Sequence, residues 1–373
     1  MTLDPRGRRA AQALLQAAEG LGPAPDLARL RRRRRRRAAR RAGLAALAVT
    51  VAAAVLWQAL APSGGPDGTR PLALPGVPGL DGHVRDAIPT GRAAGTDLVA
   101  GPDAVWVLNR SRPPDQDQLV RVDPATDRVV ARIPVGRGAL RVAVGDGSVW
   151  VLRATSGRVD LVQVDPATNR VVKTSPPLGA TSRRDRGVTE RLLVAGRVVW
   201  AVTGAGVLRY DPAAGAVVEV AGPDRVGPLS GLAVAGGSIW VVSGMVVFKL
   251  RPGDGTVLQS DAPKELTPMI PSGLAAGAGS LWVAGSGRLA RLDAVTGRVA
   301  AVFRAGPGVA TVAGDRRNVV GAGGKALYLI DPAANRVRAA VPLPQLGAVA
   351  VGGGAVWVTD EPRGRLLRVD PGP

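Results

Sequence analysis

A segment of about 40 residues repeats along most of this chain. One copy, residues 141–176, contains a short apolar strand, a glycine turn, a strand with a tryptophan, a variable loop, an alternating strand, an Asp-Pro turn and a fourth strand. Four short strands at such a period are typical of one blade of a β-propeller. The turn recurs at intervals of 38 to 46 residues, at Asp123, Asp165, Asp211, Arg251, Asp293, Asp331 and Asp370. The repeat therefore predicts an all-β fold, a seven-bladed β-propeller of four-stranded blades over residues 84–373.

The two ends of the repeat region complement each other. The chain stops at LLRVDPGP, which is a third strand without a fourth. Residues 84–91, VRDAIPTG, match the fourth strand of the first blade, VVARIPVG at residues 129–136. We therefore expect the first strand to complete the last blade and to close the ring with main-chain hydrogen bonds, which leaves no unpaired edge.

The conspicuous residues of the repeat have structural explanations. An aspartate that opens an Asp-Pro turn accepts a backbone N–H, and proline presets φ at the next position, so these aspartates are interpreted as turn formers rather than catalysts. A large aromatic side chain at a fixed blade position is expected to pack between blades rather than stack on a ligand. Blade six has Val320 there, which predicts looser packing. The tryptophans are Trp106, Trp150, Trp200, Trp240, Trp282 and Trp357.

The charge of the chain is concentrated before the repeats. The formal net charge is +20, and residues 1–41 carry thirteen arginines against three acids. Residues 42–61 follow without a charge, and twenty helical residues span about 30 Å, the thickness of a bilayer core. The positive-inside rule then places a basic tail, residues 1–41, in the cytoplasm. The sequence predicts a single-pass plasma-membrane protein with a signal anchor at 42–61, a Pro/Gly-rich linker at 62–83 and an extracytoplasmic propeller.

The tail and the anchor each leave alternatives. The tract from Arg31 to Arg41 is expected on anionic lipid, with a nucleic-acid arm or a solvated charge run as other interpretations; we expect no nucleic-acid partner. A short amphipathic helix after Asp4 lies on the membrane or docks a cytoplasmic partner. Ala59 to Ala61 resembles a signal-peptidase site, but Pro62 disfavours cleavage.

The blade motifs resemble those of known bacterial propellers. SVWV with LVQVDPATNRVV, and AVWVTDEPRGRLLRVDP, are similar to YVTN and quinoprotein-like repeats and to the streptogramin (virginiamycin B) lyase family. The likeness covers residues 84–373, and the arginine-rich composition looks actinobacterial. Those lyases use a central histidine, acidic residues and a divalent cation, whereas the single histidine here, His83, precedes the first strand. The resemblance therefore implies the blade but not the lyase reaction.

No catalytic constellation stands out in the repeats. The chain has no cysteine, which excludes disulfides and thiolate metal sites, and one histidine excludes any site that needs two imidazoles. Glycine-serine turns are not followed by helices, so they are not phosphate cradles. We expect no catalytic residue, no metal and no cofactor.

A binding site is predicted on the face that carries the variable loops, because binding residues concentrate on loops over a rigid scaffold. Aligning the first strands on the tryptophan puts six residues at one level near the channel mouth: Asp97, Arg141, Arg191, Gly231, Gly273 and Ala348. Such a mouth favours an anionic ligand or an acidic protein patch, and solvated, locally paired loop charges are the alternative. The candidate set also includes Glu190, Arg110, Arg112, Arg183, Arg184, Arg186, Lys264 and Arg363.

The function predicted from these features is recognition. The propeller is expected to bind an extracytoplasmic ligand or protein as a sensor or scaffold module. The alternative is a propeller enzyme of lyase or quinoprotein-like oxidoreductase type. A third hypothesis, that the tail regulates a cytoplasmic transcription factor, rests on a segment too short for a folded regulatory domain.

Overall fold

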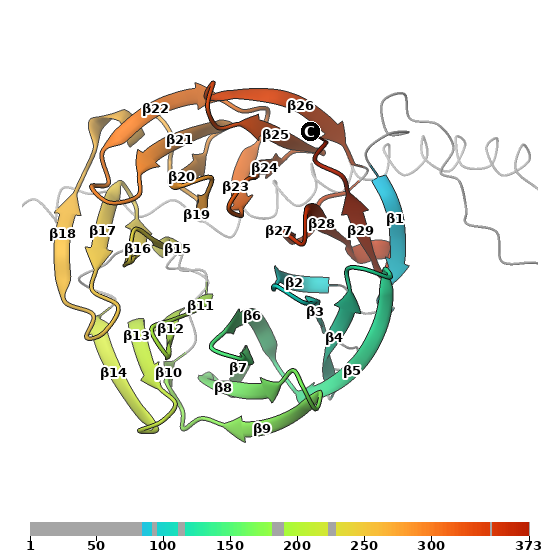
Figure 1. The fold of residues 1–373 in the computed structure, drawn as a ribbon. Coiled ribbons are helices and arrows are strands. Elements are labelled where there is room, and N and C mark those ends of the chain that lie inside the picture. Colours follow the sequence, from blue (N-terminus) through green and yellow to red (C-terminus); the bar gives the residue numbers. More distant parts are fainter. Residues whose placement is uncertain are drawn as a thin grey trace, which may run out of the picture. The chain divides into compact units, whose positions relative to one another are not determined.

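Short apolar strands separated by tight turns build seven antiparallel sheets, which stand around a common centre (Figure 1). The computed structural model describes residues 84–91, 95–110, 116–180, 190–222, 229–343 and 345–372. The predicted all-β, seven-bladed propeller with four-stranded blades is confirmed. The predicted tail, anchor and linker lie outside the described residues. Within the described ranges, no helix is long and apolar enough to cross a membrane.

Blades 1 to 4 follow one another in chain order, each running from the inner strand to the outer one. Blade 1 has β2 (Gly95–Ala100), β3 (Val105–Asn109), β4 (Asp117–Asp123) and β5 (Arg128–Gly136). Blade 2 has β6 (Ala139–Gly145), β7 (Ser148–Thr155), β8 (Arg158–Asp165) and β9 (Arg170–Thr174), and β10 (Gly179–Ala180) also pairs with β8. Blade 3 has β11 (Arg191–Ala195), β12 (Val198–Thr203), β13 (Gly206–Asp211) and β14 (Ala216–Ala221). Blade 4 has β15 (Leu229–Ala235), β16 (Ser238–Ser243), β17 (Val246–Leu250) and β18 (Val257–Asp261).

Blades 5 to 7 complete the ring, and in the described ranges two single-turn 3-10 helices lie in their loops. Blade 5 has β19 (Gly273–Gly277), β20 (Ser280–Gly285), β21 (Arg288–Asp293) and β22 (Val299–Arg304), preceded by η2 (Lys264–Leu266). Blade 6 has β23 (Val309–Gly314), β24 (Val319–Gly323), β25 (Ala326–Asp331) and β26 (Arg336–Pro342). Blade 7 has β27 (Val349–Gly352), β28 (Ala355–Asp360), η3 (Glu361–Arg363) and β29 (Arg365–Val369).

The outermost strand of blade 7 comes from the other end of the described chain. β1 (Val84–Pro89) pairs antiparallel with β29, with Ala87 opposite Leu367 and Pro89 opposite Arg365. Beyond the strand, the backbone N–H of Thr90 donates to the carbonyl of Gly364 at 2.9 Å. β1 thus lies on the rim between β29 and β5 (Figure 1).

The Asp-Pro turns form as expected. In the blade 1 turn, Asp123 Oδ1 accepts the backbone N–H of Ala125 at 2.8 Å, and Oδ2 accepts the hydroxyl of Thr126 at 2.9 Å. These bonds favour the charged form and hold the pKa of Asp123 below its usual value. In blade 4, where Arg251 replaces the first aspartate, Asp254 accepts the N–H of Thr256 at 3.0 Å instead.

The tryptophans pack between blades, as predicted. Seven apolar clusters each join two neighbouring blades, and six of them contain a tryptophan. Trp106, for example, packs with Val149 and Val162 of blade 2. The cluster between blades 6 and 7 has no tryptophan, yet Val320 is buried there against leucines of both blades, so the predicted looser packing is not seen.

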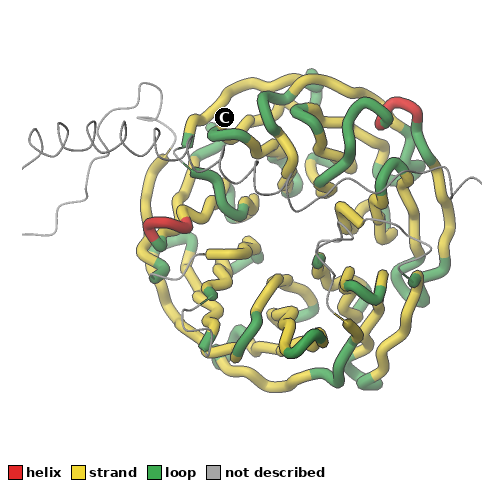
Figure 2. Tube along the Cα trace, turned by 180° about the vertical axis from the view of Figure 1, so that it is seen from behind, coloured by secondary structure: helices red, strands yellow, loops and turns green. Residues whose placement is uncertain are grey.

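We call the face that carries the Asp-Pro turns the basal face and the opposite one the loop face; Figure 2 shows the ring from the side opposite to Figure 1. On the basal face, a cationic side chain of one blade donates to a turn carbonyl of the next blade at six of the seven joins. In four of them the cation also stands 5.4 to 6.0 Å from the centre of its own blade's tryptophan ring. The bonds run from Arg121 to Pro166, Lys173 to Pro212, Lys249 to Val295, Arg291 to Pro332, Arg338 to Pro371 and Arg368 to Pro124.

Candidate binding site at the channel mouth

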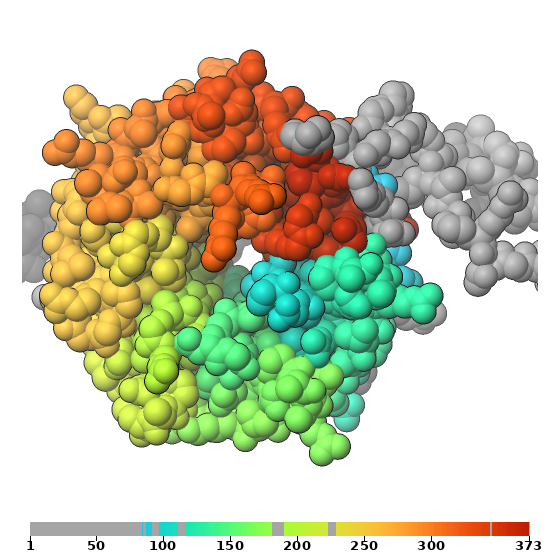
Figure 3. Space-filling model, in the orientation of Figure 1, coloured from blue at the N-terminus to red at the C-terminus, as the bar shows by residue number. Residues whose placement is uncertain are grey.

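The inner strands of all seven blades surround a central channel of about 790 Å³. The hollow at the centre of the ring is visible in the space-filling view (Figure 3). Valine, alanine, leucine and glycine make up most of its wall. Three ionisable side chains line it among the described residues: Asp97, Arg141 and Arg191.

Strand register places these three side chains at equivalent positions of consecutive blades. Asp97 in β2, Arg141 in β6 and Arg191 in β11 pair with Leu108, Leu152 and Val202, each two residues after the tryptophan of its blade. The same level on the far side of the channel carries small residues, namely Gly231, Gly273, Thr311 and Ala348. The mouth therefore has a charged half on blades 1 to 3 and a small, largely uncharged half on blades 4 to 7.

Each charged side chain contacts the backbone of the following blade. Asp97 Oδ2 accepts the N–H of Val142 at 2.8 Å, and Arg191 Nη2 donates to the carbonyl of Ser230 at 3.1 Å. Inner strands are sheet edges, and their outward N–H and C=O groups need partners. These side chains supply such partners, a role that the sequence did not reveal because it depends on how neighbouring blades approach.

The two arginines converge on one oxygen atom. Arg141 Nε donates to the carbonyl of Glu190 at 2.8 Å, and Arg191 Nη1 donates to the same carbonyl at 3.1 Å. Burial and the nearby Arg141 lower the pKa of Arg191, while Asp97 opposes this change. Burial raises the pKa of Asp97, and Arg141 and the N–H of Val142 offset part of that rise.

The remaining predicted residues are distributed more widely. Arg110 follows β3 and is exposed, and Lys264 is exposed in η2, where Leu266 is buried. Arg363 is exposed in η3 and pairs at 3.3 Å with the buried Asp360, whose same oxygen also pairs with Arg365 at 2.8 Å. Arg112, Arg183, Arg184 and Arg186 lie outside the described residues.

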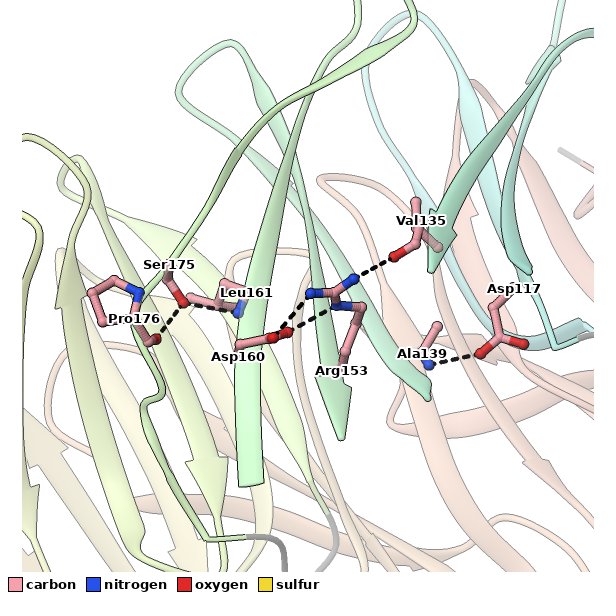
Figure 4. A network of polar contacts seen from close by, with 8 residues as sticks. All are labelled: Asp117, Val135, Ala139, Arg153, Asp160, Leu161, Ser175 and Pro176. Carbon is pink, nitrogen blue, oxygen red and sulfur yellow. Dashed lines mark hydrogen bonds and ion pairs between the residues drawn. The ribbon is translucent and has the colours of Figure 1, made fainter. Parts of the chain in front are cut away.

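A polar network between blades 1 and 2 was not predicted (Figure 4). Asp117 is fully buried, and its Oδ2 accepts the N–H of Ala139 at 2.8 Å. Arg153 donates to both oxygens of Asp160, at 2.8 and 2.9 Å, and to the carbonyl of Val135 at 2.9 Å. No repeat signal marks these residues, because they occur in one or two blades only. They fix blade 1 to blade 2 on the loop face and leave the channel mouth free.

In the described ranges, no group of three or more histidine, cysteine, aspartate or glutamate side chains is placed to hold a metal ion. His83 lies outside them.

The fold and its channel define the molecule as a seven-bladed β-propeller. It is similar to the β-propeller domain of Cps50 (Swd1) from Myceliophteria thermophila, with 9% identity, a TM-score of 0.59 and coverage of 77% of this chain and 99% of that one. It is also similar to U3-55K, with 12% identity, a TM-score of 0.58 and coverage of 77% and 98%. A chain of the Mitotic Checkpoint Complex matches with 13% identity, a TM-score of 0.57 and coverage of 83% and 96%.

Such low identities show the fold alone. No protein-family model matches the chain, and no curated protein sequence matches it. The resemblance to YVTN repeats and to streptogramin lyases therefore stays a prediction about the blade.

Proposed function

We propose that this chain is a single-pass membrane protein whose extracytoplasmic propeller recognises a protein or ligand at the channel mouth. The uncharged stretch at residues 42–61 and the arginine tract before it support the anchor and its orientation. In this proposal the tract lies on anionic lipid and the linker at 62–83 separates the propeller from the membrane.

One observation carries the recognition role. Among the described residues, the mouth concentrates the ionisable groups of the channel on three consecutive blades, over a mostly apolar wall. Charges at the rim of a partly apolar hollow orient a partner, while the apolar surface supplies binding energy. The similar chain in the Mitotic Checkpoint Complex is part of a complex. A propeller that holds partners is consistent with that likeness.

Because the chain has no cysteine, topology can be tested with single introduced cysteines. Ser156→Cys lies on an exposed loop-face turn of the propeller, and Gln12→Cys lies in the basic tail. In intact cells, a membrane-impermeant maleimide is expected to label the first variant and to label the second only after lysis. Equal labelling of both in intact cells would refute the orientation.

Partner binding can be tested by site-specific photo-crosslinking in the same cells. A photoreactive residue at Thr311, an exposed position of the channel mouth, is expected to give discrete adducts. The matched control is Val130, which is 53% exposed on the outer strand β5. If both positions give the same adducts, or neither gives any, the mouth is not where partners bind.

A further inference from the structure

The arginines of the mouth have donors to spare. A guanidinium carries five N–H groups. Within the described part of the chain, the hydrogen bonds of Arg141 engage Nε and Nη1, and those of Arg191 engage Nη1 and Nη2 once each. The backbone bonds fix both groups against one carbonyl, which leaves N–H groups of each for a ligand. This arrangement is preorganised for an acceptor with two oxygen atoms.

The channel lining has two guanidinium groups and one carboxylate, that of Asp97. The carboxylate of Glu190 also acts on Arg191 from beside the lining. The two guanidinium groups are the charged donors at this level, and a carboxylate can accept two of their N–H groups at once.

The rest of the channel suits an apolar body. From the level of Asp97 to that of Ala100 the wall extends over about 10 Å of strand, at roughly 3.3 Å per residue. A Cβ at Gly231 would lie 2.2 Å from the Cβ of Leu274, so only glycine fits at this position. Close packing of blades 4 and 5 therefore leaves this level of the mouth without a side chain on blade 4, beside the blade that carries Arg191.

We propose that the channel binds a carboxylate on an apolar chain, with the carboxylate on Arg141 and Arg191 and the chain directed along the apolar wall. The source of this group is either the C-terminus of an apolar-ended peptide or a small organic acid. The inference rests on the proposed recognition function and specifies its ligand chemistry.

Asp97 makes the site sensitive to pH. Its charged and titratable neighbours are Arg141 and Arg191, and Glu190 acts on Arg191 from the adjoining position. Protonation of Asp97 removes one of the two carboxylates that compete with the ligand for the arginines. Affinity should therefore rise as the pH falls, until the ligand's own carboxylate is protonated.

The test is isothermal titration calorimetry on the full chain in detergent. The probes are octanoate, octanamide, and the peptide acetyl-Gly-Gly-Ala-Val-Leu with a free or an amidated C-terminus. We expect binding of the carboxylate forms and binding about tenfold weaker or absent for the amides, since each lost charge-assisted contact is costly. Preference for the peptide or for octanoate identifies the source. Equal binding of acid and amide would overturn the proposal.

Variants locate the site. Arg191→Gln and Arg141→Gln are expected to weaken octanoate binding at least about tenfold. The matched control is Arg251→Gln, an arginine 55% exposed on the basal face. Should the mouth variants fail to fold, Ala348→Phe places a large side chain in the channel lining at blade 7 and is expected to block binding with both arginines in place. Unchanged affinity in Ala348→Phe would refute the location.

The outcomes separate this inference from the function on which it rests. Crosslinked partners at Thr311 without carboxylate binding would refute the ligand class and keep the recognition role. Absence of both results would refute both proposals.

Discussion

At the scale of single residues, Arg368 shows how this propeller uses its many arginines. Its guanidinium stands 5.4 Å from the ring centre of Trp357, donates to the carbonyl of Pro124 at 2.7 Å and pairs with Asp127 at 2.8 Å. One side chain thus joins blade 7 to blade 1 by an ionic bond and a hydrogen bond, while its ring contact holds it against the tryptophan of its own blade.

We expect Arg368→Gln to lower the free energy of unfolding by about 1–3 kcal/mol, because a partly buried charged bond and a cation–π contact are lost together. Urea denaturation of the purified protein measures the loss. Arg128→Gln, an exposed arginine at the start of β5, is the matched control and should change little. Equal effects of the two variants would show that the contact is not stabilising.

Asp97→Asn gives a second residue-scale prediction. The amide oxygen can still accept the N–H of Val142, but the residue no longer ionises. Because burial raises the pKa of Asp97, the folded wild type binds a proton more readily than the unfolded chain. Wild-type stability relative to Asp97→Asn should therefore fall as the pH rises from about 4 through the raised pKa, and then level off. Unfolding curves at several pH values check the sign, and a pH-independent difference would contradict it.

At the scale of elements, the stability that the Asp-Pro turns contribute depends on pH in the sense opposite to that of Asp97. The backbone N–H of Thr256, its side chain and Arg251 lower the pKa of Asp254 to about 2. Turn hydrogen bonds also lower the pKa values of Asp123, Asp165, Asp293 and Asp331. A lowered folded pKa contributes stability that is present above the unfolded value and is lost as the carboxylate is protonated.

We therefore expect the free energy of unfolding to decrease between pH of about 4 and 2, as the turn aspartates lose their charge. Asp254→Asn should make this decrease smaller, as measured by urea midpoints across that range. Asp103→Asn, at an exposed aspartate before β3, is the control and should leave the decrease unchanged. The same decrease in both variants would show that Asp254 is not one of its sources.

The blade was predictable from the sequence because its signals are local. Asp123 and Thr126 form their turn within four residues. The tryptophan, such as Trp106, follows a glycine-containing turn in every blade that has one. The bond from Arg121 to Pro166 was not predictable, since the two residues meet only when blades stand side by side. The convergence of Arg141 and Arg191 on Glu190 was hidden for the same reason, although alignment did place both arginines at one level.

At the scale of the whole molecule, β1 links the two ends of the propeller. Its pairing supplies the outer strand of blade 7, and Ile88 is buried against the cluster between blades 7 and 1. A chain that begins at residue 92 should lose about 5 kcal/mol, from several main-chain bonds and one buried isoleucine.

That loss corresponds to a Tm lower by about 8 °C for a domain of this size. Differential scanning calorimetry of chains that begin at residues 84 and 92 measures it. The free peptide VRDAIPTG should restore part of the Tm of the shorter chain in a concentration-dependent way. A shorter chain with an unchanged Tm would show that β1 is dispensable.

The position of β1 also determines how the propeller bears mechanical load. Val84 lies opposite Val369, next to the basal turn at Asp370, while the channel mouth opens on the loop face. Tension between the chain before Val84 and a partner at the mouth acts along β1. Its hydrogen bonds to β29 are then sheared together rather than unzipped one after another. A propeller held by the chain before Val84, as in the proposed arrangement, would therefore carry load on all these hydrogen bonds at once.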